Sequence, residues 1–249
     1  MTARARRVYK VGGPALEDPQ LIAPLAKEIR AFDGDVALVH GGGRQVERLL
    51  KQLGIESKFI GGRRETSPAA MEVVEMVLSG TMNKSLAGGL VRAGVPALGL
   101  SGRDGDLIRA TLVEGLGQVG SPERVNPAIL QALWTAKFIP VISPVSGGPG
   151  GEAVNINADE AAQWIARAIG AQTLVFLSDV DGVILDGASA THLNEAQIEA
   201  RTADGSIHGG MAMKVRMALD AARSGIQAVI IAGRARLSDG FPGTEISLT

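Results

Sequence analysis

Short apolar runs alternate with amphipathic stretches along most of the chain. The first strand-like runs, residues 7–11 and 35–39, are each followed by a helical stretch, residues 19–31 and 44–53. Further strand-like runs lie at residues 96–100, 138–143, 173–178 and 227–232. This βαβα order predicts a mainly parallel sheet with helices on both faces. The sequence therefore predicts an α/β fold, a three-layer αβα sandwich around an open, mainly parallel sheet.

Local signals mark some of the boundaries. Residues 67–68 and 126–127 read Ser-Pro and Asn-Pro, in which a capping side chain precedes a proline suited to the first turn of a helix. The glycine-rich residues 146–151 predict a loop, a lid or hairpin, which is followed by a short strand and a helix from about Ala158. Residues 71–84 predict a helix with an apolar face.

The composition is that of a folded, nearly neutral protein. The 249 residues are 45% hydrophobic, which is enough apolar surface for a substantial core. A net charge of -1 gives no field that would attract nucleic acid or a membrane, and the basic residues 2–7 are interpreted as a solvated terminus. The sequence contains neither an apolar run of membrane-spanning length nor a signal peptide. We expect a cytoplasmic protein with no nucleic-acid or membrane partner.

The residues that usually bind metals are scarce. The chain has no cysteine, which excludes disulfides, thiolate metal sites and a cysteine nucleophile. Its three histidines, His40, His192 and His208, are too scattered to indicate a zinc site. We expect no dedicated metal site.

Glycine turns follow the first two predicted strands, at residues 10–13 and 40–43. Ligands of open parallel sheets lie beyond the carboxyl ends of the strands, where helix amino termini present unpaired N–H groups. Neither turn matches a P-loop, and each alone is typical of a plain tight turn. Together, on successive βα units, they predict a phosphate cradle in which Lys10 supplies a point charge.

A second lysine, Lys214, lies just after a glycine pair at the start of an amphipathic helix. It could be an ordinary surface residue, but two of only seven lysines lie beside glycine pairs. Asp159 is either a first-turn acid favoured by the helix dipole or the carboxylate that holds both lysines.

Two other motifs indicate different functions. Residues 115–120 fit a dinucleotide-binding pattern, but Ser-Pro follows instead of a helix, and no acidic residue lies about twenty positions on. Residues 176–187, with Asp179 and Asp181, resemble the nucleophile motif of haloacid-dehalogenase-type phosphatases. That motif normally opens its domain, and no paired acidic motif follows here. A phosphatase is therefore a remote alternative.

Nine segments spread along nearly the whole chain resemble the amino-acid kinase family and, within it, the acetylglutamate and acetylaminoadipate kinase group. They read KVGG, HGGG, MEVVEMVLSGTMNK, GLSGRDGDLI, RVNPAIL, FIPVISPV, VNINADEAA, LSDVDGVI and GGMAMKV. The resemblance implies a carbamate kinase-like fold in a single domain, residues 1–249. An amino-terminal lobe, residues 1–170, would bind the acceptor, and a carboxyl-terminal lobe, residues 171–249, would bind the nucleotide.

The resemblance also implies a reaction: ATP phosphorylates the side-chain carboxylate of N-acetyl-L-glutamate to an acyl phosphate, in arginine biosynthesis. Mg²⁺ would arrive with the nucleotide. Lys10 and Lys214 would bind the transferring phosphate, and Asp159 would organise them. The other implied contacts are Gly12, Gly13, Gly42 and Gly43 to phosphate; Gly42, Gly43, Arg64 and Asn155 to the acceptor; and Ser178, Asp179, Val180, Gly182, Val183, Gly210, Met211 and Lys214 to the nucleotide.

The chain departs from the family pattern at residues 61–67, GGRRETS, where the family more usually reads like NGLRVTD. Arg64 stays aligned, but Arg63 and Glu65 replace apolar residues. The extra arginines would suit an alternative acceptor, 2-aminoadipate or glutamate linked to a small acidic carrier protein, although solvated charges are the simpler interpretation. A non-catalytic ligand-binding regulator is a further alternative, which the presence of Lys10, Asp159 and Lys214 disfavours.

The resemblance also bears on assembly. Arginine-inhibited members of the family carry an extra amino-terminal helix that links dimers into hexamers, whereas about seven residues precede the first predicted strand here. We expect a homodimer that is insensitive to arginine.

Overall fold

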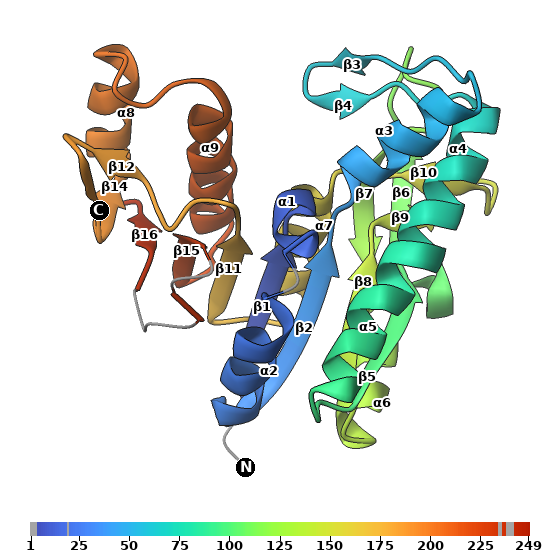
Figure 1. Ribbon diagram of the computed structural model, residues 1–249, viewed down its shortest axis with the longest axis horizontal. Coiled ribbons are helices and arrows are strands. Elements are labelled where there is room, and N and C mark those ends of the chain that lie inside the picture. Colours follow the sequence, from blue (N-terminus) through green and yellow to red (C-terminus); the bar gives the residue numbers. More distant parts are fainter. Residues whose placement is uncertain (1–3, 19, 234–235, 238–241) are drawn as a thin grey trace.

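The computed structural model describes residues 4–18, 20–233, 236–237 and 242–249. Within these residues the main sheet has eight strands in the order β14-β16-β15-β11-β1-β2-β8-β5 (Figure 1). Its strands are β1 (Ala5–Val11), β2 (Gly34–His40), β5 (Ala97–Ser101), β8 (Ile139–Ser143), β11 (Thr173–Leu177), β14 (His192–Asn194), β15 (Ala228–Ala232) and β16 (Thr244–Ser247). Among the described pairings of this main sheet only β15–β16 is antiparallel, so the predicted mainly parallel sheet is confirmed.

Helices cover both faces of this sheet. They are α1 (Gly13–Leu16), α2 (Ile22–Ala31), α3 (Gly43–Gln52), α4 (Pro68–Glu75), α5 (Asn83–Arg92), α6 (Ala128–Thr135), α7 (Ala158–Ala168), α8 (Glu195–Ala203) and α9 (Gly209–Arg223). Alternate residues of β1 face opposite layers, because successive strand side chains point to opposite sides. Val8 belongs to the core under α7, and Tyr9 belongs to the core under α2 and α5. The predicted three-layer sandwich is confirmed.

Smaller strands lie beside the main sheet. They are β6 (Ile108–Leu112), β7 (Gly120–Val125), β9 (Val145–Gly147) and β10 (Ala153–Asn155) in one sheet, and the hairpins β3 (Phe59–Ile60) with β4 (Arg63–Arg64) and β12 (Ile184–Leu185) with β13 (Ala188–Ser189). A short 3₁₀ turn, η2 (Asp104–Asp106), precedes β6. Strands β9 and β10 confirm the predicted hairpin. The loop is shorter than residues 146–151, because Ser146 and Gly147 belong to β9 and pair with β10.

The predicted helix starts hold to within a few residues. Ser67 caps α4 by accepting a hydrogen bond from the Ala70 N–H at 3.2 Å, and proline occupies the first turn. The Asn126 side chain accepts from the Ala128 N–H at 3.2 Å, but α6 begins one residue after the proline. The first predicted helix, residues 19–31, begins only at Ile22. The helix from Ala158 is confirmed.

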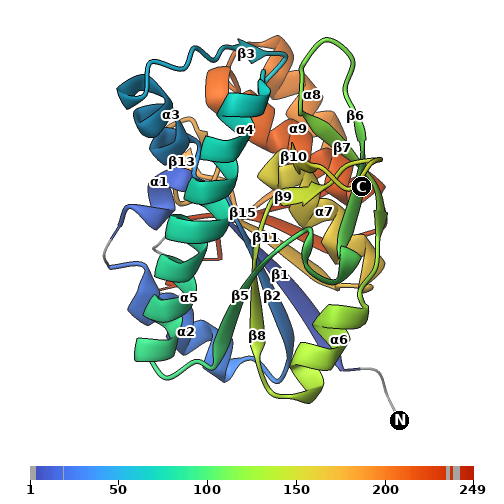
Figure 2. The same cartoon turned by 90° about the vertical axis from the view of Figure 1, so that its right-hand side faces the viewer.

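The predicted helix at residues 71–84 contains a change of helix type. α4 passes into a π-helical segment, η1 (Met76–Met82), and then into α5, which together form one long column in Figure 2. A π segment places one extra residue in each turn. The column packs its apolar side against α3 and the main sheet.

The boundary predicted at residue 170 falls in the turn between α7 and β11. Strand β11 pairs with β1 over five residues, so the main sheet is continuous across that boundary. The division into two lobes stays a prediction.

Candidate active site

The two predicted glycine turns adjoin at the carboxyl ends of β1 and β2. A Cβ built on Gly13 would lie 3.8 Å from the backbone nitrogens of both Gly42 and Gly43. A Cβ on Gly41 would lie 3.9 Å from the Cβ of Ala158, the first residue of α7. The glycine turns and the amino-terminal ends of α3 and α7 therefore converge, and we call this place the cradle. Backbone N–H groups and helix dipoles favour an anion there.

One of the four predicted phosphate-binding glycines has another partner. The N–H of Gly12 donates to the carbonyl of Leu177 at 3.0 Å and extends the pairing of β1 with β11. The prediction that it donates to a phosphate does not fit this geometry. Gly42 is constrained instead by its backbone, because its φ is 153° and a Cβ would meet Leu78 Cδ2 at 2.6 Å.

Lys10 and Asp159 form an ion pair beside the cradle. Lys10 is the last but one residue of β1, and its Nζ lies 2.9 Å from Asp159 Oδ1, with both side chains largely buried. Asp159 lies in the first turn of α7, and its N–H donates to the side chain of the capping residue Asn157 at 2.7 Å. The cap and the helix dipole both support a carboxylate at this position.

Lys214 has different partners. It projects from α9, and its Nζ donates to Ser178 Oγ at 2.5 Å and to Asp179 Oδ1 at 3.1 Å. Ser178 also donates to Asp179 at 2.8 Å, and these hydrogen bonds from Ser178 and Lys214 lower the pKa of Asp179. Lys214 therefore joins two predicted nucleotide residues. The idea that Asp159 holds both lysines does not match this structure, in which Asp179 is the carboxylate within hydrogen-bond reach of Lys214.

The rest of the predicted nucleotide set divides between buried and accessible positions. Val183 is fully buried, and its N–H donates to Thr244 Oγ1 at 2.8 Å. Gly182 has a φ of 158°, and a Cβ there would lie 2.7 Å from the same hydroxyl. These two residues shape the turn after β11 and offer no side chain to a ligand. Val180, Gly210 and Met211 complete the set, in the turn after β11 and the first turn of α9.

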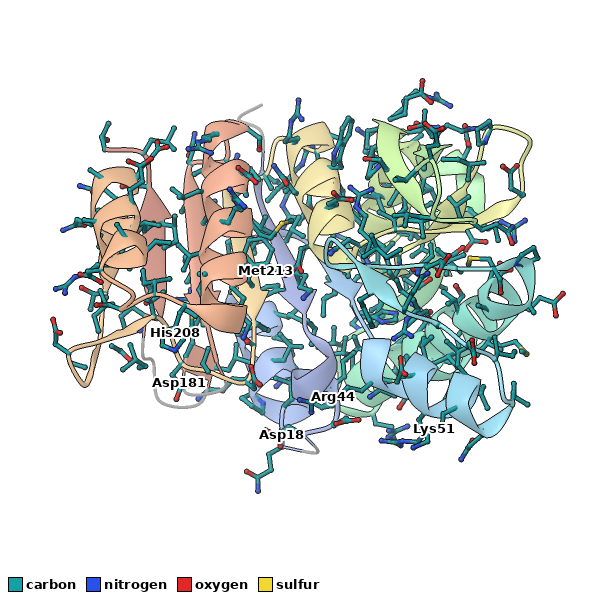
Figure 3. The ribbon with its side chains drawn as sticks, turned by 90° about the horizontal axis from the view of Figure 1, so that it is seen from above. Asp18, Arg44, Lys51, Asp181, His208 and Met213 are labelled. Atoms are coloured by element: carbon teal, nitrogen blue, oxygen red, sulfur yellow. The ribbon has the colours of Figure 1, made fainter. Side chains whose placement is uncertain are left out.

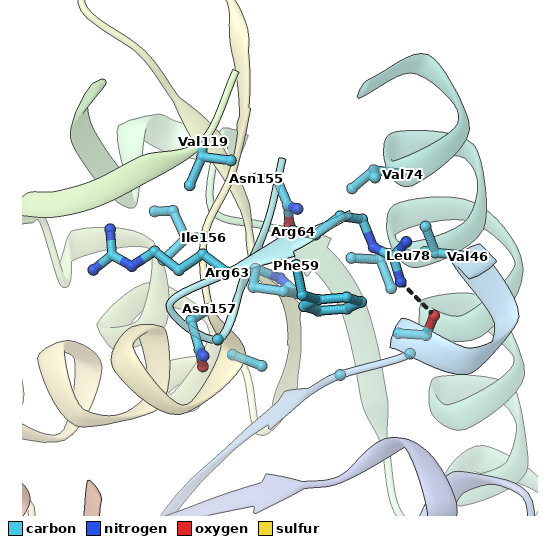
Figure 4. A pocket seen from close by; sticks show the side chains of 16 residues that line it. Val46, Phe59, Arg63, Arg64, Val74, Leu78, Val119, Asn155, Ile156 and Asn157 are labelled. Atoms are coloured by element: carbon cyan, nitrogen blue, oxygen red, sulfur yellow. Dashed lines mark hydrogen bonds between the residues drawn. The ribbon is translucent and has the colours of Figure 1, made fainter. Parts of the chain in front are cut away.

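All four predicted acceptor residues line one pocket of about 150 Å³ next to the cradle (Figure 4). They are Gly42, Gly43, Arg64 and Asn155. Apolar side chains from α3, α4, η1 and neighbouring strands complete the wall: Val46, Phe59, Val74, Leu78, Val119 and Ile156. The pocket thus combines two arginines, Arg63 and Arg64, with a mainly apolar lining.

Arg64 is buried, and its guanidinium is held from several sides. It donates to the Glu47 carboxylate, to Ser57 Oγ at 3.0 Å and to the carbonyl of Gly43 at 3.2 Å, the bond drawn as a dashed line in Figure 4. The ring of Phe59 lies 4.5 Å from its Cζ. A guanidinium held in this way offers a directed charge for a carboxylate.

The sequence did not predict the partner of Arg63. In Figure 4 Arg63 and Arg64 point in opposite directions from β4. The Nη2 of Arg63 lies 2.5 Å from Oε1 of Glu160, the residue after Asp159 in α7. The doubled arginine at residues 63–64 was a visible signal, but nothing in the sequence pointed to Glu160.

His40 was considered in the sequence only as a metal ligand. It is fully buried at the end of β2, and Nδ1 lies 2.8 Å from the carbonyl of Gly41 while Nε2 lies 3.1 Å from Nδ2 of Asn83. Burial lowers its pKa to about 4, so the ring is neutral at pH 7. A neutral ring that donates to the Gly41 carbonyl and accepts from Asn83 fixes the first glycine of the turn.

In the described part of the chain, no group of three or more His, Cys, Asp or Glu residues could hold a metal ion. The described helices also include none with the length and apolar character needed to cross a membrane.

Comparisons with known proteins agree with this fold. The family model of the amino acid kinase family matches residues 5–232. The chain is 44% identical over 247 residues to acetylglutamate kinase of Rubrobacter xylanophilus, covering 96% of this chain and 94% of that protein. It is 41% identical over 238 residues to acetylglutamate kinase of Chloroflexus aurantiacus, covering 94% of each. The solved structure of Giardia carbamate kinase superposes with a TM-score of 0.72 at 16% identity over the full length of both chains, which shows the fold alone.

Proposed function

Because the chain belongs to the amino acid kinase family, we propose that it transfers the γ-phosphoryl group of ATP to the side-chain carboxylate of N-acetyl-L-glutamate, in arginine biosynthesis. The observation that carries this proposal is the pocket beside the cradle, which collects Arg64 and Asn155 within reach of the Lys10 turn in a chain so similar to acetylglutamate kinases. The product would be an acyl phosphate.

The pocket suits a small acidic acceptor. Its volume of about 150 Å³ is below the 300–1,000 Å³ typical of drug-sized ligands. The Arg64 guanidinium would hold the α-carboxylate, and the Asn155 side chain would bind beside it. Apolar neighbours such as Val46 and Leu78 would accommodate the acetyl group. The acceptor's side-chain carboxylate would then point toward the cradle.

Phosphoryl transfer needs alignment and charge neutralisation more than covalent help. An oxygen of the acceptor carboxylate attacks the γ-phosphorus, and the bond to the bridging oxygen breaks, so ADP leaves with that electron pair. Lys10, oriented by Asp159, and the N–H groups of Gly13, Gly42 and Gly43 would stabilise the transferring group. On the nucleotide side, Lys214 beside Ser178 and Asp179 would neutralise phosphate oxygens.

The residues present fit ATP, because Lys10 and the glycine N–H groups adjoin at the cradle and Lys214 lies beside two residues predicted to bind the nucleotide. They do not form a dedicated metal site in the described residues, so Mg²⁺ would be carried by the nucleotide and supply part of the charge neutralisation.

The alternatives have less support. A carrier-linked acceptor needs a basic mouth, but Arg64 is buried and Arg63 is paired with Glu160. A phosphatase of the haloacid-dehalogenase type needs Asp179 as a nucleophile, whereas here it accepts hydrogen bonds from Ser178 and Lys214. A regulator without turnover is disfavoured by the enzymes that are 41% and 44% identical over most of the chain.

The test is an ADP-release assay with hydroxylamine as a trap for the acyl phosphate. N-acetyl-L-glutamate should support turnover and give the hydroxamate, and N-acetyl-L-2-aminoadipate should be poorer by about ten- to a hundredfold, because one methylene changes binding by about 1–3 kcal/mol. Activity only with a carrier-linked acceptor, with free N-acetyl-L-glutamate inert at millimolar concentration, would reverse the assignment.

We also propose that the enzyme is a cytoplasmic homodimer. The edge strand β5 supports the second part, since it pairs only with β8 among the described strands and exposes Leu98. Phe138, just before β8, and Val91, near the end of α5, are exposed as well. An edge with exposed apolar residues is suited to a second copy.

A further inference from the structure

The hairpin β3–β4 forms one wall of the acceptor pocket but has little core of its own. Each of its strands has two residues, and Phe59 and Ile60 are 60% and 43% exposed. The Lys58–Glu65 ion pair within the hairpin region is solvent-exposed and 3.4 Å long, so it contributes little. Contacts with the rest of the molecule must therefore fix the position of the hairpin.

The Arg63–Glu160 pair is such a contact. Its two side chains are only 24% and 22% exposed, and the 2.5 Å bond joins β4 to the first turn of α7. Burial raises the pKa of Glu160, and the Arg63 guanidinium opposes that rise. The second carboxylate oxygen of Glu160 is buried without a hydrogen-bond partner. Loss of Arg63 would leave a partly buried carboxylate with neither oxygen paired, which is costly.

The partner helix is a firm attachment point. α7 buries Ala161, Ala162 and Ile165 in the core, and Asp159 beside Glu160 holds Lys10. Consecutive residues of α7 therefore hold the hairpin and the predicted catalytic lysine. The tip of the hairpin also approaches α9: a Cβ on Gly62 would lie 3.3 Å from Cε of Met213, labelled in Figure 3.

We propose that Arg63 and Glu160 are positioning residues, a latch that holds hairpin β3–β4 closed over the pocket and thereby sets the affinity for the acceptor. The identity of that acceptor rests on the proposed function, whereas the latch itself does not.

The first experiment uses the free protein and no substrate. Hydrogen exchange is measured for Arg63→Ala, Glu160→Gln and Arg63→Lys, at the Glu65 amide, which donates to the Lys58 carbonyl at 2.9 Å. Exchange should be about three- to tenfold faster in Arg63→Ala and Glu160→Gln, because the hairpin opens more often when the ion pair is lost. It should be less affected in Arg63→Lys, which keeps a positive charge near Glu160. Unchanged exchange in both Arg63→Ala and Glu160→Gln would overturn the latch.

The matched control is Arg103→Ala, which removes the Arg103–Glu75 pair of similar length, 2.6 Å, outside the acceptor pocket. It should leave exchange in the hairpin and the kinetics with the acceptor unchanged. An equal effect of Arg103→Ala on the hairpin would also count against the latch.

The second experiment measures kinetics and calorimetric binding. The acceptor's KM and Kd should rise about three- to tenfold in Arg63→Ala and in Glu160→Gln, with kcat and the KM for ATP within about twofold. The double variant should be no worse than either single variant, because both remove one interaction. Additive effects would overturn the latch, as would a defect confined to Arg63→Ala, which would make Arg63 a direct ligand. If exchange rises but no tested acceptor is phosphorylated, the latch stands and the proposed function fails.

Discussion

Lys10 and Lys214 lie on different elements, and each is paired with a different carboxylate. Lys10 is paired with Asp159, and Lys214 is paired with Asp179. Each would neutralise charge that develops on the transferring phosphoryl group, so Lys10→Ala and Lys214→Ala should each lower kcat by about 10² or more. Steady-state kinetics measures this, with circular dichroism to verify folding. Near-normal turnover in either variant would remove that lysine from the site.

Arg64 should behave differently from the lysines. A clamp on the α-carboxylate holds the ground state and the transition state alike, so Arg64→Ala should raise the acceptor's KM by about tenfold to a hundredfold with a smaller change in kcat. Glu47, which loses its partner, is exposed enough to be solvated. Initial rates at varied acceptor and varied ATP separate the two outcomes. A rise in the KM for ATP instead would mean that the two ligands are placed the wrong way round.

His40 should make stability depend on pH. Its pKa is about 4 in the fold, against 6.5 for the unfolded reference. As pH falls, the unfolded chain takes up the proton first, so the stabilisation is fully present above about pH 6.5 and is lost progressively toward pH 4. The loss amounts to about 3 kcal/mol. The free energy of unfolding, measured by urea denaturation between pH 4 and 7, should depend less steeply on pH in His40→Gln than in the wild type. The same pH dependence in both proteins would contradict the lowered pKa of His40.

At the level of elements, the sequence predicted helix starts that depend on neighbouring residues alone. The Ser-Pro signal at residues 67–68 located the start of α4, because the cap and the proline act within one turn. The π segment was not predicted. Val74, Leu78 and Asn83 are buried along the column, at spacings of four and then five residues. The five-residue step matches a π turn, but the third buried residue is polar and could not be read as core from the sequence.

Asn157 tests the link between a helix cap and the site. Asn157→Ala removes the acceptor for the Asp159 N–H and should destabilise the fold by about 1 kcal/mol and lower kcat, because Asp159 orients Lys10. Denaturation and kinetics measure the two effects. The matched control is Asn126→Ala, which removes the similar bond at the start of α6. It should cost comparable stability and leave kcat unchanged. Equal kinetic defects in both variants would show that the effect is merely a general loss of stability.

Across the whole molecule, topology explains which parts of the site could be foreseen. Lys10 lies near the end of β1, and the glycine turns follow β1 and β2. These neighbouring parallel strands have their carboxyl ends at one edge of the sheet, so the meeting of these residues follows from the strand order. Arg64 and Asn155 came only from the family resemblance. Arg63 and Glu160 are 97 residues apart, and their contact depends on how β4 folds over α7. No local pattern encodes such a pair.

The proposed homodimer is a prediction at this scale. Light scattering should give about twice the chain mass of 25.7 kDa. Leu98→Lys at the β5 edge should shift the protein toward the monomer, because a charge on an edge strand opposes pairing with a second copy. A control charge at the exposed Ile184, in the β12–β13 hairpin, should leave the mass unchanged. A monomer or hexamer for the wild type would contradict the proposal.

The cradle also bears on how much of the protein is folded in the cell. Gly13, Gly42 and Gly43 bring backbone N–H groups together near the Lys10–Asp159 pair, so the cradle favours a bound anion in the folded chain. A ligand that binds only the folded chain adds stability with its concentration, about 2.7 kcal/mol at a hundredfold excess over Kd. A larger supply of nucleotide and acceptor would then raise the free energy of unfolding, so the liganded enzyme should resist proteolysis better than the free one.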